Sequence, residues 1–146
     1  MTIEDIEQLL PNGFHDSYIT ALHVNYAQRT AEIDMKIWVS GPEAADPDEY
    51  QPLKLSLSGL IYFVIEPPGD LYLDTSEPWL VAGGSSEVET SPSRLPKSLP
   101  AGAFTYWFFV NNWNSYIHIA ALTAELVVPP QTHRLPDNPD TVLNEN

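Results

Sequence analysis

The chain has 146 residues, and its six basic and twenty acidic side chains give a formal net charge of −14 at pH 7. This length accommodates a single domain with a real hydrophobic core, and the 11% aromatic content favours a folded protein over a disordered one. The absence of cysteine excludes disulfides, thiolate zinc sites and thiol nucleophiles, and the acidity disfavours nucleic acid and anionic membranes as partners.

The start of the chain predicts no targeting segment. Residues 1–5 lack the basic residues and the apolar core of a signal peptide. No apolar run approaches the roughly 20 residues that are needed to span a bilayer. We therefore expect a cytoplasmic protein.

The first expected element is a short helix over residues 3–10. Thr2 is its N-cap candidate, and the apolar residues recur at helical spacing: Ile3, Ile6, Leu9 and Leu10. Pro11-Asn12-Gly13 then ends the helix, because proline cannot continue the hydrogen-bond ladder and Asn-Gly favours a turn.

The chain after this turn has the pattern of β-strands. Apolar and polar residues alternate over residues 17–26 and again over 31–39. The link between them, residues 27–30, is so short that only antiparallel strands can use it. These two strands are therefore expected to form a hairpin.

A proline-rich acidic loop over residues 41–52 precedes a long third strand over 53–66. The alternation of this strand changes phase near Gly59, which predicts a β-bulge or a bend. Residues 61–65 are apolar on both faces, so we expect this part to be covered on both sides or to lie at a homodimer contact.

Residues 67–102 are rich in proline, glycine and serine, which is typical of loops. A structureless link of this length is unusual in a compact domain. We therefore expect residues 79–82 to pair as a short strand, and the remainder to form a lid or an excursion from the domain.

A second hairpin is expected from the strand-like runs 103–110 and 116–128, which the polar turn 111–115 joins. The tail 129–146 has four prolines and little apolar content, so it is expected to be extended or disordered. The predicted fold is mainly β (α+β): a single domain over 1–128, with a short N-terminal helix followed by a five- or six-stranded, largely antiparallel sheet that forms a sandwich or partial barrel.

Histidines supply the candidate chemistry. His15 beside Asp16 offers a near-neutral base next to a carboxylate, as in general acid-base and metal sites. His23 and His118 fall on predicted strands and would complete a zinc or iron constellation if the two hairpins were neighbours. The structural alternative, in which Asp16 caps the turn and the histidines are satisfied locally, carries more weight, so no metal is assigned.

Aromatic and amide side chains cluster at the second hairpin. Trp107 and Trp113 with Asn112 and Asn114 could bind a sugar, a base or a peptide, because apolar rings stack while amides fix orientation. A core packing role with an Asn-rich turn is the structural alternative. The chain has no Gly-rich phosphate loop and no Gly-x-Ser-x-Gly elbow, which disfavours common nucleotide-binding and hydrolase classes.

Two segments carry a resemblance: Leu10-Pro11-Asn12-Gly13-Phe14-His15-Asp16 leading into Ile37-Trp38-Val39, and Asn114-Ser115-Tyr116-Ile117-His118-Ile119-Ala120-Ala121. They resemble small uncharacterised bacterial proteins with a GFHDA-type opening, some of which are similar to immunity proteins of bacterial toxin systems. The resemblance covers the first forty residues and the last hairpin. It implies a non-enzymatic protein that binds and blocks a partner, and it transfers no binding residue.

Three functional hypotheses follow. The first is a small acidic binding protein, immunity-like, that binds a basic protein partner without catalysis. The alternative is a small-molecule or metal binding protein or hydrolase that uses His15, Asp16 and His118 in a pocket under residues 67–102. The third is a homodimer through residues 61–65, with function elsewhere. No cofactor is assigned.

Overall fold

The chain opens with a seven-residue helix, α1 (Ile3–Leu9). Thr2 and Asp5 form a capping box, in which Thr2 Oγ1 accepts from the Asp5 N–H at 3.1 Å and Asp5 Oδ2 accepts from the Thr2 N–H at 2.8 Å. The hydrogen bond from the Thr2 backbone lowers the pKa of the Asp5 carboxyl. The predicted helix and its N-cap are confirmed.

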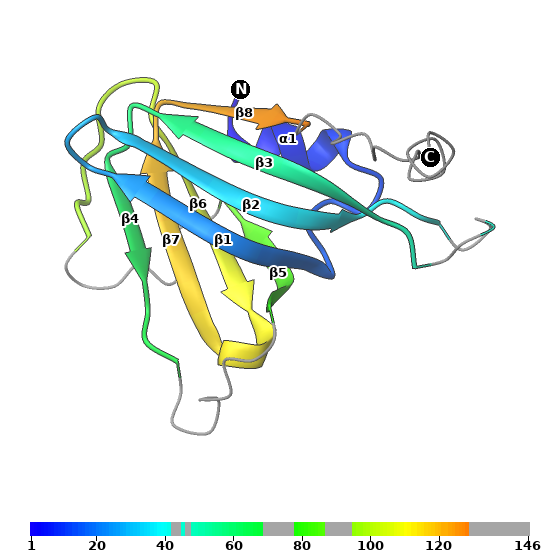
Figure 1. Ribbon diagram of the computed structural model, residues 1–146. Helices are drawn as coiled ribbons and strands as arrows, with labels where there is room; N and C mark the ends of the chain where they lie inside the picture. The colour runs from blue at the N-terminus through cyan, green and yellow to red at the C-terminus, as the bar shows by residue number, and fades with distance from the viewer. Residues whose placement is uncertain (42–44, 46–47, 69–77, 87–94, 129–146) are drawn as a thin grey trace, which may run out of the picture.

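The computed structural model describes residues 1–41, 45, 48–68, 78–86 and 95–128. In these residues the chain forms one antiparallel sheet, in the order β4-β7-β6-β5-β1-β2-β3-β8, whose ends do not pair with each other (Figure 1). The strands are β1 (Ser17–Asn25), β2 (Thr30–Trp38), β3 (Tyr50–Ser58), β4 (Tyr62–Ile65), β5 (Trp79–Ser85), β6 (Phe104–Val110), β7 (Ser115–Ala121) and β8 (Thr123–Val127), with a 3₁₀ turn, η1 (Asn111–Trp113), between β6 and β7.

The mainly β class with an N-terminal helix is confirmed, as are both hairpins and the strand that begins at Trp79. The expected count of five or six strands is too low, because the described residues alone form eight. Most of the predicted lid, residues 69–77 and 87–94, and the predicted tail, 129–146, lie outside the described residues.

The strand count differs because two long runs each bend at a shared corner. Gly59, between β3 and β4, has φ +63°, and a Cβ on it would lie 2.7 Å from the Leu122 side chain. Leu122, between β7 and β8, donates its N–H to the carbonyls of Ser58 and Gly59 at 3.2 Å. The predicted bend at Gly59 is confirmed, whereas no feature of residues 116–128 marks the corner at Leu122.

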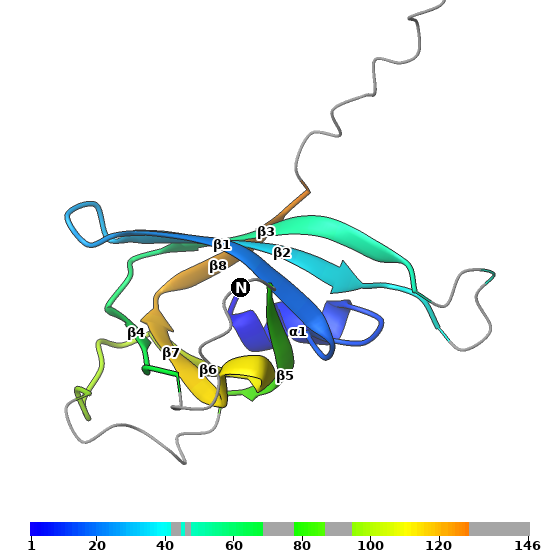
Figure 2. The same ribbon diagram turned by 60° about the horizontal axis from the view of Figure 1, so that its bottom comes forward.

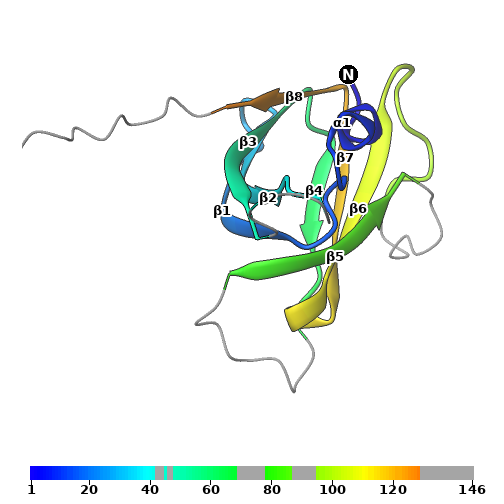
Figure 3. The same ribbon diagram turned by 90° about the vertical axis from the view of Figure 1, so that its right-hand side faces the viewer.

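The corner turns the sheet back over itself. Figures 2 and 3 show β1, β2, β3 and β8 on one side and β4, β7 and β6 on the other, with α1 in the opening between β8 and β6. The N–H of Ala124 on β8 donates to the Met1 carbonyl at 2.7 Å, which fixes the start of the chain at that edge.

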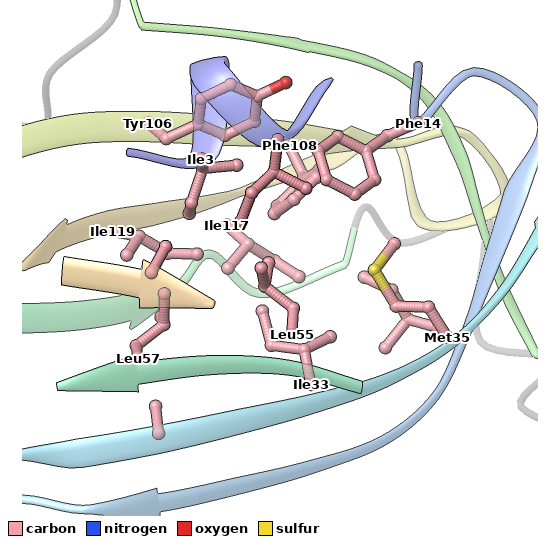
Figure 4. Close-up of a cluster of buried hydrophobic side chains, with 14 of the residues drawn as sticks. Ile3, Phe14, Ile33, Met35, Leu55, Leu57, Tyr106, Phe108, Ile117 and Ile119 are labelled. Carbon is pink, nitrogen blue, oxygen red and sulfur yellow. The ribbon is translucent and has the colours of Figure 1, made fainter. Parts of the chain in front are cut away.

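The core lies between the two halves of the sheet and under α1 (Figure 4). Ile3 and Ile6 of α1 and Phe14 of the following turn are fully buried. The strands contribute inward side chains at alternate positions, among them Ile33, Met35, Leu55, Leu57, Tyr106, Phe108, Ile117 and Ile119. Burial of this apolar surface supplies the main driving force for folding.

The edge of β4 is partly occupied by a side chain from the β1–β2 turn. The Tyr26 hydroxyl donates to the Phe63 carbonyl at 2.9 Å and accepts from the Phe63 N–H at 2.7 Å. Unpaired backbone N–H and carbonyl groups at a sheet edge can hydrogen-bond to another chain. The Tyr26 hydroxyl occupies both groups of Phe63. A homodimer through residues 61–65 stays a prediction, and strand addition there would have to displace Tyr26.

Candidate functional site

An open cleft of about 500 Å³ lies on the outer face of β1, β2 and β3, lined by Tyr18, Lys36, Tyr50 and Pro78. The pairing register explains how these side chains meet. Tyr18 on β1 is opposite Lys36 on β2. Tyr50 on β3 is opposite Trp38, which is two residues after Lys36 and therefore lies on the same face of β2. The tyrosine rings therefore meet across β2, with centroids 5.4 Å apart and planes inclined at 50°.

Each cleft tyrosine follows a carboxylate by two residues: Asp16 precedes Tyr18, and Asp48 precedes Tyr50. Burial is the main cause of a raised pKa at Tyr50, and Tyr18 and the negative charges of Asp16 and Asp48 add to it. Both carboxylates thus act electrostatically on the same ring. The cleft thus combines two aromatic rings with the ammonium group of Lys36, and two carboxylates lie close enough to influence one of the rings.

The sequence around Phe14 fixes the backbone of Asp16, two residues before Tyr18. Phe14 is fully buried and meets Phe108 edge-on, with ring centroids 5.3 Å apart. Asp16 has φ +60° and donates its N–H to the Val81 carbonyl at 2.9 Å, so its backbone is anchored to β5. Its carboxylate Oδ2 lies 3.0 Å from His15 Nδ1.

The His15–Asp16 pair is a surface pair, not an enclosed catalytic dyad. The His15 side chain is 62% exposed and that of Asp16 is 45% exposed. Exposed ion pairs of this kind contribute little to stability. The pair therefore contributes polar groups to the surface next to Tyr18, and the buried member of the motif is Phe14.

The structure does not bring the predicted histidines together. His23 is opposite Glu32 near the far end of β1, whereas His15 lies before the start of the strand at Ser17; the strand from Ser17 to His23 alone spans about 20 Å. His118 lies on β7, three strands away from β1 in the sheet. Among the described residues, no group of three histidine, aspartate or glutamate side chains could hold a metal ion.

His118 has a local partner instead. It is 4% exposed, and its Nε2 lies 2.8 Å from Glu66 Oε1. The Tyr116 ring stacks on its imidazole at 5.8 Å. A buried polar side chain with a hydrogen-bond partner and a stacked ring fits the structural interpretation that the sequence favoured.

The four residues of the predicted aromatic and amide surface lie on β6 and in the turn that follows it. Trp107 lies on β6, opposite His118, whereas Trp113 packs on Trp79 with ring centroids 4.2 Å apart. Asn114 has φ +48° and ends η1. Trp113 and Asn112 therefore contact neighbouring residues at the start of β5, whereas Trp107 lies on β6, and the predicted surface stays a prediction.

Asn112 instead supports one wall of the tyrosine cleft. Its Oδ1 accepts from the Leu80 N–H at 3.0 Å, and its Nδ2 donates to the Pro78 carbonyl at 2.9 Å. Leu80 is opposite Tyr18 in the pairing of β5 with β1. Asn112 thereby fixes Pro78 beside the cleft, which is a positioning role.

Sequence reasoning missed Tyr18, Lys36, Tyr50 and Pro78 as a group. One signal was present, namely the repeated spacing Asp16-Ser17-Tyr18 and Asp48-Glu49-Tyr50. In each case the acid comes just before a strand and the tyrosine lies at the start of it, so the pattern marks the beginnings of β1 and β3. The pattern alone could not show that the two strands flank a common neighbour.

Comparison with protein-family models, curated proteins and solved structures finds no match to this chain. In the described part of the chain, none of the helices has the length and apolar character needed to cross a membrane. The class of protein that the fold defines is an antiparallel β-protein with an N-terminal helix, and its candidate site is a surface cleft of aromatic and charged side chains.

Proposed function

We propose that this protein is an acidic, non-catalytic binding protein that takes a basic protein partner, in the manner of bacterial immunity proteins. The observation that supports this function best is the open cleft in which the rings of Tyr18 and Tyr50 meet, with Lys36 and Pro78 beside them. Tyrosine is enriched in protein interfaces because its ring offers a large contact area while its hydroxyl remains hydrated.

The net charge of the whole chain adds a second argument. With twenty acidic and six basic residues, the long-range field attracts a basic protein and speeds its diffusional encounter. The half-buried rings of the cleft would then provide the short-range contacts that hold the complex. A complex formed in this way is weakened by salt, because exposed charges are screened beyond about 8 Å at physiological ionic strength.

The hydrolase or metal-binding alternative depends on His15, Asp16 and His118 in one pocket. His15 and Asp16 precede β1, while His118 lies three strands away and is buried against Glu66. A general base must come within hydrogen-bond reach of the group that it deprotonates, so a joint role for these residues has no geometric support. Binding is therefore the function that we develop.

The test is a pull-down from a lysate of the source organism, with the tagged protein as bait and a rising salt gradient as eluent. We expect a basic protein to be retained and to elute at moderate salt. A Tyr18→Ala/Tyr50→Ala variant should lose that protein, whereas Glu125→Gln, on the outer face of β8, should retain it.

A second bait, an unrelated protein of equal negative charge, controls for simple ion exchange. The proposal fails if no basic protein is retained, or if the control bait retains the same proteins at the same salt concentration. If a basic protein is retained and has enzymatic activity, its inhibition by this protein can be measured directly.

A further inference from the structure

We infer that the tyrosine cleft binds a small planar aromatic carboxylate, whose ring packs on Tyr18 and Tyr50 and whose negative charge lies against Lys36. The inference goes beyond the proposed function, because a small molecule of this class can bind whether or not a protein partner does. It is based on the lining of the cleft. The described residues that form this lining are two tyrosines, a proline and a lysine, so the charge that they present is an ammonium.

Lys36 is a cation without a counter-ion in the part of the chain that the structure describes. Its side chain is exposed, and no carboxylate there comes within ion-pair distance of it. Lys54, on the same outer face, is paired instead: its Nζ lies 3.3 Å from Glu32 Oε2 and 3.9 Å from Asp34 Oδ1. An unpaired ammonium in a cleft attracts an anion that enters it.

The acidity of the chain limits the charge that the ligand can carry. Asp16 lies 3.0 Å from His15, and the net charge of −14 acts on an anion from all sides. Exposed charges are screened beyond about 8 Å at physiological ionic strength, whereas Lys36 acts at contact distance. A single ammonium matches a monoanion. A phosphate ester would bring a charge of about −1.5 to −2, which one lysine does not neutralise.

The tyrosine rings favour a flat aromatic ligand. Both side chains are half-buried, with ring centroids 5.4 Å apart and planes inclined at 50°. The two rings therefore touch without stacking in parallel, and both still line the cleft. Aromatic pairs prefer offset or edge-to-face contacts, so a third ring can pack against this pair.

The Pro78 wall of the cleft is held in place by a side chain from the β6–β7 turn. Asn112 Nδ2 donates to the Pro78 carbonyl at 2.9 Å, and Asn112 Oδ1 accepts from the Leu80 N–H at 3.0 Å. Between these two residues, Trp79 packs on Trp113 with ring centroids 4.2 Å apart. A wall that is fixed in advance loses little conformational freedom when a ligand binds.

The experiment is an NMR titration of the full-length protein at physiological salt with three probes of nearly equal shape. Benzoate is the anion, benzamide is the neutral control and benzamidine is the cation. We expect saturable shifts at Tyr18, Lys36 and Tyr50. Benzoate should bind about fivefold more tightly than benzamide, and benzamidine should bind more weakly than both.

Two lysine variants test the origin of this preference. Lys36→Met should weaken benzoate binding about fivefold and leave benzamide binding within about twofold, because only the charge contact is lost. Lys54→Met removes the same charge from a paired lysine on the same face and is the matched control. It should leave the binding of both probes within about twofold.

A ring variant tests the other half of the site. Tyr50→Ala should weaken benzoate and benzamide alike, because both depend on the ring contact, and Tyr50→Phe should restore both. The unfolding midpoint of each variant confirms that it remains folded.

The inference is overturned if benzoate gives no saturable shifts at the cleft, if benzamidine binds more tightly than benzoate, or if Lys54→Met costs as much as Lys36→Met. None of these results touches the proposed function, which stands as long as a basic protein is retained from lysate. A failed pull-down with a positive benzoate titration would reject the protein partner and keep the carboxylate site.

Discussion

At the scale of single residues, Tyr106 joins the core of β6 to the helix that covers it. Its side chain is 1% exposed, and its hydroxyl donates to Glu7 Oε2 on α1 at 2.9 Å. Figure 4 shows the ring among the buried side chains, with its oxygen directed away from the centre of the core. The core therefore contains a polar group that is satisfied by α1.

Substitution of Tyr106 by phenylalanine should lower the free energy of unfolding by about 1 kcal/mol, because one hydrogen bond to a carboxylate is lost while the ring stays in place. Glu7 is half-buried and can be hydrated in the variant. Urea unfolding measures the change. Tyr62→Phe is the control, since no hydrogen bond of the Tyr62 hydroxyl to a described residue is lost. An equal loss in both variants would contradict the prediction.

The stabilities of the wild type and of Tyr106→Phe should also differ in their dependence on pH. Burial is the main cause of a raised pKa at Tyr106, above its ordinary value of 10.0, and the charge of Glu7 adds to it. Below pH 10 the phenol is neutral in both the folded and unfolded states. Above it, the unfolded chain releases the proton first, so the contribution of Tyr106 to stability is lost as pH rises toward the folded-state pKa.

The stability advantage of the wild type over Tyr106→Phe should therefore be constant up to about pH 10 and should shrink at higher pH. Urea midpoints of both proteins between neutral and strongly alkaline pH measure this difference. A gap that widens above pH 10 would show that the folded state, not the unfolded state, ionises Tyr106 more readily.

Two adjacent glycines of β5 differ in what surrounds them. A Cβ on Gly84 would lie 2.6 Å from the Tyr106 ring and 2.7 Å from the Trp107 carbonyl, whereas a Cβ on Gly83 would meet nothing within 4 Å. Gly84→Ala should cost about 1–3 kcal/mol, because a backbone atom cannot move aside cheaply. Gly83→Ala should change the free energy of unfolding by less than about 1 kcal/mol. Equal costs, measured by urea unfolding, would refute the close approach at Gly84.

The candidate site shows at this scale why residue type alone misleads. His15, His118 and Asn112 stood out in the sequence because their side chains can do chemistry. The structure places His15 at the surface, pairs His118 with Glu66, and uses Asn112 to hold Pro78. Burial and partners decide what an ionisable or amide group does, and both depend on residues far away in the chain.

At the scale of elements, the edge of β4 depends on a turn that belongs to another hairpin. Arg29, at φ +56° in that turn, accepts the Leu60 N–H at its carbonyl and donates its Nε–H to the Leu60 carbonyl. Tyr26 from the same turn occupies the outward backbone groups of Phe63. The β1–β2 turn thus covers the start of β4.

Tyr26→Phe should expose the N–H and carbonyl of Phe63 to solvent at the edge of β4. We expect a loss of about 1 kcal/mol in the free energy of unfolding, since both groups can be hydrated, and a greater tendency to self-associate at high concentration. Urea unfolding and sedimentation velocity measure the two effects. Unchanged stability and an unchanged sedimentation coefficient would show that Tyr26 neither stabilises the edge of β4 nor prevents its pairing with another chain.

Most elements could be predicted from the sequence because their signals are local. The capping box at Thr2, the short link 27–30 and the turn 111–115 each act within a few residues, and the structure confirms the helix and both hairpins. The corner at Leu122 could not be predicted, since its cause is the approach of Gly59 from a different strand. The number of strands follows from that tertiary contact.

At the scale of the whole molecule, repulsion between twenty acidic residues opposes folding at low ionic strength. Salt screens this repulsion, and it also screens attractive pairs such as Lys54 with Glu32. Surface pairs contribute at most about 1 kcal/mol each, so screened repulsion should dominate.

The thermal midpoint should therefore rise when sodium chloride is added from low to physiological concentration. Differential scanning calorimetry measures it, and an equal osmolality of sucrose controls for general exclusion of the solute. A midpoint that falls with salt would mean that attractive ion pairs outweigh the repulsion of the net charge.

The sequence by itself determined the class of fold, the helix with its cap, the hairpins and the acidity, because each is a property of composition or of neighbours along the chain. Only the tertiary structure decided the order of the eight strands, the corner at Gly59 and Leu122, and the meeting of Tyr18 with Tyr50 across β2. These features are contacts between distant segments, and their energies become favourable only when the whole sheet has formed.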